Sequence, residues 1–155
     1  MVVRRDRALV LKRTPFSESS LVVQVIGSEF GRVHLLAKGA YRPTSGYFAI
    51  LDRFDTLELE WWHSERSELG LLRRGEIVRR RRYISADLAL YRAAHSMLEH
   101  VEIAALPGIG ERRLFELLEA GFDALAEVEL DPELGLVVFE LEYLRLLGLS
   151  PELVA

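Results

Sequence analysis

The pattern of apolar residues changes once along this chain of 155 residues, at about residue 83, and the change constrains the fold. Before it, apolar residues form short β-rich runs, such as residues 55–61, where Leu57, Leu59 and Trp61 alternate with polar residues. After it, they recur at helical spacing in longer segments. The sequence therefore predicts an α+β chain with two domains, residues 1–83 and 84–155.

The first domain is predicted to be a small β-barrel. Its β-rich runs cover residues 7–13, 21–26, 32–38, 55–61 and 68–78. Leu9 and Leu11 share one face of the first run, and Gly70 and Gly75 are expected to produce bulges or bends in the last. Five short strands are too few for an immunoglobulin-like sandwich and suit a closed five-stranded barrel such as an OB-fold. An SH3-like barrel fits the strand count nearly as well.

The second domain is predicted to be helical. Three segments end in helix-breaking residues: about residues 85–105, 111–120 and 132–147. Ser85 is expected to cap the first, with Asp87 in its first turn, and Gly121 to stop the second. The third is apolar on most sides, so it is expected to be buried in a bundle core. Its two apolar stripes are Leu134, Val137, Val138, Leu141 and Leu144, and Leu136, Phe139, Tyr143 and Leu146.

The net charge of −4 conceals two halves of opposite sign. Residues 1–83 carry 16 basic and 10 acidic side chains, a net +6, whereas residues 84–155 carry 4 and 14, a net −10. A basic domain indicates a polyanionic partner, and an acidic one repels DNA. The run Arg79–Arg82 at the junction has two interpretations, a solvated linker or a contact to phosphate.

Composition excludes several classes of protein. No apolar run approaches the roughly 20 residues needed to span a bilayer, so no membrane association and a cytoplasmic location are expected. Without cysteine there is no disulfide, no thiol nucleophile and no thiolate metal site in this chain. The histidines lack metal-like spacing, and no serine lies in a Gly-x-Ser-x-Gly turn. The chain is therefore expected to be no enzyme and to bind no cofactor.

The segment of residues 38–46, Lys-Gly-Ala-Tyr-Arg-Pro-Thr-Ser-Gly, follows a predicted strand and favours nucleic-acid binding over a plain basic loop. Lys38 and Arg42 can neutralise phosphates, and Tyr41 can stack on an unpaired base. The order of residues required for a nucleotide P-loop is absent. Trp61 and Trp62 are adjacent on a strand and face opposite sides, so one belongs in the core. The other could stack on a base or seal the interface between the domains, and the interface is favoured.

Several short motifs follow one another along the chain in an order that is typical of one protein family. They include Leu11-Lys-Arg-Thr-Pro-Phe-Ser-Glu-Ser-Ser20, Glu29-Phe-Gly-Arg-Val-His-Leu-Leu-Ala-Lys-Gly-Ala40, Leu57-Glu-Leu-Glu-Trp61 and Leu114-Phe-Glu-Leu-Leu118. With these motifs the chain resembles the RecO recombination-mediator family, densely over about residues 5–80 and more weakly beyond. The resemblance implies an N-terminal OB-fold followed by a helical domain.

The resemblance also implies a function. RecO-like proteins are non-catalytic and bacterial, bind single- and double-stranded DNA, and anneal complementary strands. They act with RecR and single-stranded DNA-binding protein, and help load RecA onto coated strands. Lys38 and Arg42 lie in the motif that the family uses for DNA contact, while Arg13 and Arg32 lie in neighbouring motifs. Arg73 and Arg74 join the candidate DNA-binding residues on charge and strand position alone.

The chain departs from the family at its end. Typical members continue well past the motif ending at Pro151, and many carry a four-cysteine zinc site a few residues later. This sequence ends at Ala155 without cysteine, so it is either a naturally short member or a truncated chain whose helical domain is incomplete. Zinc is expected only if the chain continues with cysteines.

Three other interpretations remain at this point. The chain could be a protein-interaction module whose helical half docks a partner, with incidental DNA binding. It could be a metal-dependent hydrolase or nuclease that uses surface carboxylates. Residues 106–110, Leu-Pro-Gly-Ile-Gly, resemble a helix-hairpin-helix DNA motif, in which backbone N–H groups bind phosphate. The simpler interpretation of this segment is a helix stop followed by a new start.

Overall fold

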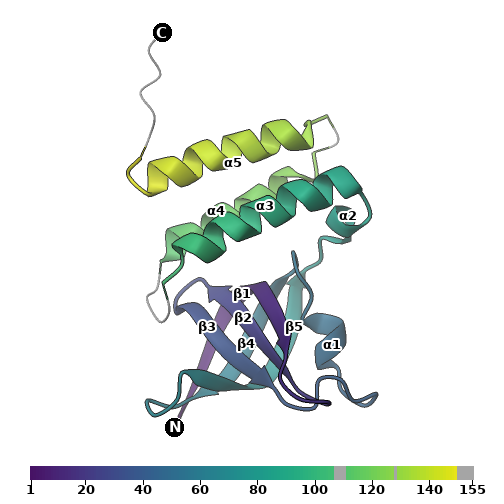
Figure 1. Ribbon diagram of the computed structural model, residues 1–155, viewed down its shortest axis with the longest axis vertical. Coiled ribbons are helices and arrows are strands. Elements are labelled where there is room, and N and C mark those ends of the chain that lie inside the picture. Colours follow the sequence, from purple (N-terminus) through teal and green to yellow (C-terminus); the bar gives the residue numbers. More distant parts are fainter. Residues whose placement is uncertain (107–110, 128, 150–155) are drawn as a thin grey trace.

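The computed structural model describes residues 1–106, 111–127 and 129–149 as a β-barrel covered on one side by helices (Figure 1). The strands are β1 (Val2–Pro15), β2 (Leu21–Gly27), β3 (Gly31–Ala37), β4 (Thr56–His63) and β5 (Leu69–Arg79). The helices are α1 (Tyr47–Ile50), α2 (Arg82–Ser85), α3 (Leu88–Ala104), α4 (Arg112–Ala124) and α5 (Pro132–Leu146).

The barrel is closed in the strand order β1-β2-β3-β5-β4. Neighbouring strands run antiparallel except for β3 and β5, which are parallel and complete the closure. The short helix α1 lies between β3 and β4 in the sequence. This arrangement is an OB-fold followed by helices, and it confirms the predicted fold class.

The barrel interior is filled by alternating residues, as the sequence predicts for Leu57, Leu59 and Trp61, none more than 1% exposed. The prediction that Gly70 and Gly75 cause bulges is wrong. The register shifts of β5 against β4 fall elsewhere, between Leu72 and Arg74 and between Ile77 and Arg79. The two glycines instead make room for the core. A Cβ atom on Gly70 would lie 2.8 Å from Cδ1 of Trp61, and one on Gly75 would lie 2.8 Å from Cδ1 of Ile50.

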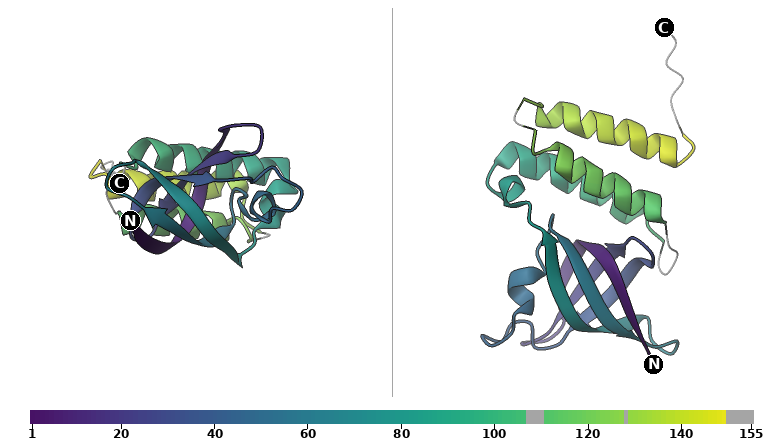
Figure 2. Two further views of the ribbon diagram at one scale, coloured as in Figure 1. Left: turned by 90° about the horizontal axis from the view of Figure 1, so that it is seen from below. Right: turned by 180° about the vertical axis from the view of Figure 1, so that it is seen from behind.

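The outer face of β1 and β2 forms the interface with the helices. Leu9 and Leu11 share a face, as predicted, and it points away from the barrel interior into a cluster with Met97 and Phe122. Between them, Val10 points into the barrel, so this stretch of β1 is buried on both sides. Helices α3 and α4 therefore pack directly on the barrel, and α5 forms an outer layer on them (Figure 2).

Two predicted helix boundaries are wrong. Ser85 ends the short helix α2, and Asp87 is the N-cap of α3, where its carboxylate accepts the Leu90 N–H at 3.0 Å. Helix α4 does not stop at Gly121 but continues to Ala124. This glycine lies where three helices meet, because its Cβ would come within 2.9 Å of Met97 and of Phe139. Gly121 is therefore glycine because the neighbouring helices pack closely against it, not because the helix ends there.

Helix α5 is buried on one side only, so the prediction of a fully buried helix is wrong. Phe139 is 3% exposed and Tyr143 is 8% exposed, and both pack against the core. Because α3 and α4 contact α5 from one side, the other stripe lies on the molecular surface (Figure 1). The exposed members of that stripe are Leu134, Val137, Val138 and Leu141.

The paired tryptophans follow the prediction in part. Trp61 lies in the barrel core, with Phe30 edge-on at a centroid distance of 5.7 Å. Trp62 does not lie at the domain interface. It pairs across the sheet with Val3 and Leu71 on the outside of the barrel, and the Arg73 guanidinium lies 5.2 Å from its ring centroid. In the part of the chain that the structure describes, no helix is long and apolar enough to cross a membrane.

Candidate nucleic-acid interface

The loop after β3 is held in a defined conformation by its backbone. Gly39 adopts a left-handed conformation with φ of 71°, and its N–H donates to Oγ of Ser20 at 3.2 Å. The Tyr41 N–H donates to the carbonyl of Ser19 at 3.0 Å, and the Arg42 N–H to that of Gly39 at 3.0 Å. The loop is therefore fastened to the β1–β2 connection, and it presents exposed Lys38 and Arg42 side chains.

Two exposed aromatic rings lie next to this loop. Tyr41 and Phe48 are 39% and 54% exposed, and their ring centroids are 5.6 Å apart. Arg13 reaches the same place, where its Nη1 donates to the Leu51 carbonyl at 3.2 Å and its guanidinium lies 6.0 Å from the Phe48 ring. Exposed rings among cations are what unpaired bases bind, through stacking and phosphate contact.

Beside this loop lies a shallow hollow of about 310 Å³, lined by Arg13, Leu21, Tyr41, Phe48 and Arg53. Within the described residues, the cations around it form no ion pair with a carboxylate. Their charge is therefore available to an outside anion. We define the basic surface as Arg13, Lys38, Tyr41, Arg42, Phe48 and Arg53. It unites four of the candidate residues (Arg13, Lys38, Tyr41 and Arg42) with two that the sequence analysis did not select.

Arg32 lies apart from the basic surface. Its Nη2 donates to Oε1 of Gln24 at 2.7 Å, and its Nη1 donates to the Glu102 carbonyl at 3.2 Å. Residue 102 lies in the last turn of α3, whose free carbonyls favour a cation. Arg32 thus joins the barrel to the helical domain, and its guanidinium is already engaged by protein groups.

Arg73 and Arg74 lie on a surface where the charges are paired. Nη1 of Arg73 is 3.5 Å from Oε2 of Glu60, and Arg74 is the cross-strand neighbour of Glu60. Nearby, Nε of Arg5 donates to Oε1 of Glu58 at 2.8 Å, and this hydrogen bond lowers the pKa of the Glu58 carboxyl. We define the paired surface as Arg5, Glu58, Glu60, Arg73, Arg74 and Glu76.

In the arginine run at the junction, every second residue is engaged by Asp123 of α4. Nη1 of Arg79 lies 3.1 Å from Oδ2 of Asp123 on α4. Arg81 is only 1% exposed, and its Nε donates to Oδ1 of the same aspartate at 2.8 Å. Arg80 and Arg82 are exposed and form no ion pair with any described residue. The run is therefore neither a plain linker nor uniformly available to phosphate.

Arg81 also fixes the segment before β4. Its Nη1 donates to the Phe54 carbonyl at 2.7 Å and to Oγ1 of Thr56 at 2.8 Å, while its backbone N–H donates to Oδ1 of Asp55 at 2.8 Å. Phe54 has a φ of 76°, a strained value for a residue with a bulky side chain. Its ring packs edge-on against Phe122 of α4 at 5.3 Å. Arg81 therefore joins the start of β4 and the end of β5 to the helical domain.

Asp123 is the acidic partner at this junction. Burial alone raises the pKa of its carboxyl, but the hydrogen bonds and charges of Arg81 and Arg79 outweigh burial and lower the pKa below its ordinary value. The carboxylate is thus the form that the folded protein favours. Sequence reasoning missed this group, because its partners lie more than 40 residues away in the chain.

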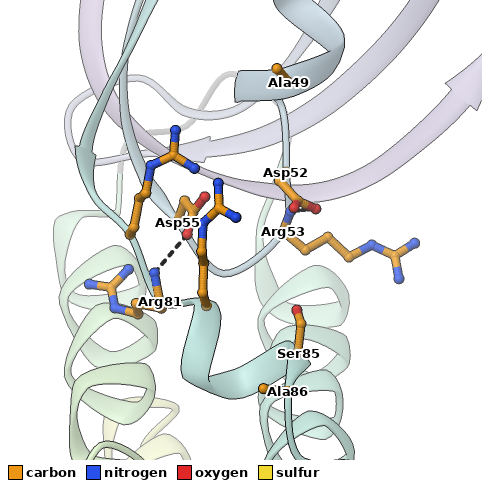
Figure 3. A pocket seen from close by; sticks show the side chains of 9 residues that line it. Ala49, Asp52, Arg53, Asp55, Arg81, Ser85 and Ala86 are labelled. Atoms are coloured by element: carbon orange, nitrogen blue, oxygen red, sulfur yellow. Dashed lines mark hydrogen bonds between the residues drawn. The ribbon is translucent and has the colours of Figure 1, made fainter.

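A hollow of about 360 Å³ opens at the junction, between the segment after α1 and the start of α2 (Figure 3). Asp52 and Arg53 lie on one side of it, and Ser85 and Ala86 on the other. Its remaining lining residues are Ala49, Asp55, Arg80, Arg81 and Arg82. We refer to this hollow as the junction pocket. Arg53 lines both the junction pocket and the hollow of the basic surface.

Two sequence-based hypotheses receive no geometric support from the described residues. The suggested helix-hairpin-helix segment, residues 107–110, lies outside them. Among the residues that the structure describes, no three histidine or acidic side chains gather as metal ligands. The arrangement that remains is a rigid, cationic and aromatic surface on an OB-fold barrel, with a helical domain packed on the β1–β2 face.

Comparison with known families identifies this arrangement. Residues 1–81 match the family model "Recombination protein O N terminal", and residues 85–155 match "Recombination protein O C terminal". Together the two models cover nearly the whole chain. The chain belongs to the RecO family.

Individual relatives agree. A DNA repair protein RecO of Vibrio cholerae is 34% identical over 143 residues, which cover 92% of this chain and 57% of the relative. One of Exiguobacterium sibiricum is 26% identical over 152 residues, covering 98% of this chain and 60% of the relative. One of Ralstonia nicotianae is 42% identical over 76 residues, about half of this chain and 27% of the relative. The chain thus spans under two thirds of the length of these relatives.

Proposed function

We propose that this chain is a non-catalytic DNA-binding component of recombination and repair, working at the bacterial nucleoid. The observation that carries the proposal is the basic surface, where cations without carboxylate partners surround two exposed aromatic rings. The proposal also draws on the names of the relatives, which are DNA repair proteins.

The chemistry of the surface supports binding with little sequence preference. Lys38 and Arg42 offer charge to backbone phosphates, which every DNA sequence carries. Tyr41 and Phe48 offer faces on which any unpaired base can stack, so single strands gain a contact that duplexes lack. The cations also bind phosphates of double-stranded DNA. A surface that neutralises phosphates lowers the repulsion between two single strands, and it would thereby promote annealing.

The family resemblance extends the proposal to partners. We propose that the protein acts with RecR and helps to load RecA onto strands coated by single-stranded DNA-binding protein. A pull-down with each purified partner tests this extension. Retention of RecR, and of single-stranded DNA-binding protein through its own tail, is the expected result. Failure to retain either would restrict the proposal to DNA binding alone.

The test of DNA binding is the double variant Lys38→Glu/Arg42→Glu, titrated against labelled single- and double-stranded oligonucleotides over a range of salt. We expect affinity to fall about tenfold or more, and the slope of log K against log salt to flatten by about 1.4 for single strands, as for two lost phosphate contacts. The matched control is Arg66→Glu/Arg92→Glu, which reverses two exposed charges away from the basic surface. A folded double variant with wild-type affinity and salt slope would overturn the proposal.

A second candidate function also has an observation in its favour. The exposed apolar stripe of α5 suits a protein-interaction module, in which DNA binding would be incidental. That candidate predicts micromolar or weaker DNA binding at physiological salt, insensitive to Lys38 and Arg42, so the same titration separates the two. Incubation of DNA with Mg²⁺ or Mn²⁺ tests the nuclease alternative, and we expect the DNA to stay intact.

A further inference from the structure

The basic surface does not end at the loop after β3. Arg53, which lines its hollow with Phe48 and Tyr41, also lines the junction pocket. The two hollows therefore share a wall formed by the segment directly after α1. A strand lying on the aromatic rings could therefore continue past Arg53 to the junction pocket, which Arg80 and Arg82 also line.

The junction pocket offers hydrogen-bond donors that no described residue engages. Nε of Arg53 is buried and has no hydrogen-bond partner among the described residues. Arg80 and Arg82 are exposed on the pocket and without a carboxylate partner in the described chain, and the Ser85 hydroxyl is another possible donor. Guanidinium groups match phosphate geometry well, because each can donate two parallel hydrogen bonds.

Each acidic residue of the pocket accepts one backbone N–H. Oδ1 of Asp55 accepts the Arg81 backbone N–H at 2.8 Å, and Oδ1 of Asp52 accepts the Arg53 N–H at 2.9 Å. Four arginines and two aspartates line the pocket, which leaves a net positive charge even with Arg81 engaged by Asp123. The pocket therefore attracts an anion.

The fold keeps these arginines in position. Arg79 and Arg81 hold the chain to Asp123 of α4 on either side of Arg80. Arg82 follows directly as the first residue of α2. The two exposed arginines thus stand on a backbone anchored by the two that are engaged, which reduces the entropy lost when they bind an anion.

We propose that the junction pocket is a second phosphate subsite, where Arg53, Arg80 and Arg82 bind a backbone phosphate of the DNA strand that lies on the basic surface. This inference rests on the proposed function and adds the path of the strand, from the loop after β3, past α1, to the domain junction. A strand long enough to reach the junction gains a contact that a short strand does not.

The experiment compares Arg80→Ala/Arg82→Ala with wild type on thymidine oligonucleotides of about 6 and about 25 nucleotides, within and beyond the span of an OB-fold site. We expect the long oligonucleotide to bind about tenfold more weakly to the variant, and the short one to change less than about twofold. The matched control, Arg66→Ala/Arg92→Ala, removes two exposed charges outside the path and should change neither. Melting curves establish that each variant is folded, and Arg80→Gln/Arg82→Gln replaces the alanine variant if it is not.

The outcomes separate the two proposals. If Arg80→Ala/Arg82→Ala binds the long strand like wild type while Lys38→Glu/Arg42→Glu binds it more weakly, the subsite proposal is wrong and the proposed function stands. Equal losses for both lengths would also remove the subsite, because a general charge effect does not depend on strand length. If Lys38→Glu/Arg42→Glu and Arg80→Ala/Arg82→Ala both bind like wild type, the proposed function itself is wrong.

A second measurement follows affinity against strand length, from about 6 to about 25 thymidines, in wild type and in Arg80→Ala/Arg82→Ala. In wild type, affinity should rise further once the strand is long enough to reach the junction pocket, and this later rise should be absent from the variant. The same length dependence in both proteins would overturn the subsite.

Discussion

The domain junction and the basic surface contain the same kind of side chain in two different settings. At the junction, the guanidinium groups of Arg32, Arg79 and Arg81 bind carbonyls and carboxylates of the helical domain. On the basic surface, Arg13, Lys38 and Arg42 have no carboxylate partner within the described residues. Residue type therefore does not separate structural cations from cations available to a ligand. The presence of a protein partner does.

The difference has an energetic reason. A buried guanidinium is tolerated only where its lost hydration is replaced by hydrogen bonds, so removing it leaves several acceptors without a donor. An exposed cation without a partner keeps its hydration and exchanges it for phosphate when DNA arrives. Substitutions should therefore affect the free energy of unfolding at the junction and DNA affinity on the basic surface.

The largest effect is expected for Arg81→Ala. The change leaves Asp123, Thr56 and the Phe54 carbonyl without their buried donor, so the free energy of unfolding should fall by about 3–5 kcal/mol. Urea denaturation measures it. The neighbouring Arg80→Ala is the control and should stay within about 0.5 kcal/mol of wild type. Equal losses in the two variants would show that the alternation along the run has no structural meaning.

Arg32→Ala should have the next largest effect. Its hydrogen bonds to Gln24 and to the end of α3 are partly buried, and we expect a loss of about 1–2 kcal/mol in the free energy of unfolding. DNA affinity of the folded variant should stay within about twofold of wild type. The opposite pattern, weaker DNA binding with unchanged stability, would show that Arg32 contributes to DNA binding.

The contribution of Asp123 should depend on pH. Its pKa in the folded protein lies below that in the unfolded chain, so the folded state favours the carboxylate. The stabilisation is therefore complete above the unfolded pKa, about 4, and is lost as the pH falls through the lower, folded value. Asp123→Asn should be less stable than wild type at pH 7, and the difference should shrink below about pH 4. A difference that is constant from pH 7 to pH 3 would contradict the ion pair.

The smallest effect is expected on the paired surface. Arg5 and Glu58 form an exposed ion pair that solvent screens, so Arg5→Ala should leave the urea denaturation midpoint close to that of wild type. Arg74→Ala should change DNA affinity less than about twofold, because Glu60 and Glu76 already balance the local charge. A large loss of DNA affinity in Arg74→Ala would extend the DNA-binding region across β5.

The strands and helices were largely readable from the sequence, because their signals are local. The alternation of Leu57, Leu59 and Trp61 predicts their burial. The change from basic to acidic composition at about residue 83 coincides with the change from β-rich to helical pattern. The errors have a common origin in tertiary contacts. Gly70 and Gly121 are small because other side chains approach them, a requirement that no local pattern reveals.

In the candidate site, too, some residues could be predicted from local sequence and others only from tertiary contacts. The loop motif predicts that Lys38, Tyr41 and Arg42 lie together, since they are neighbours in the chain. That Phe48 and Arg53 join them depends on how α1 folds back beside the loop. That Arg32 belongs elsewhere depends on α3, some 70 residues further along.

The sequence by itself determined the order of the five strands and the three long helices, the inward side of β4 and the opposite charges of the two halves, because hydropathy period and charge are properties of neighbouring residues. Only the tertiary structure decided which arginines are engaged. Asp123 takes Arg79 and Arg81 and leaves Arg80 and Arg82 exposed, although all four are consecutive. The reason is physical. The partner of a charge is whichever group packing brings within hydrogen-bond distance, and at this junction packing joins residues 42 positions apart.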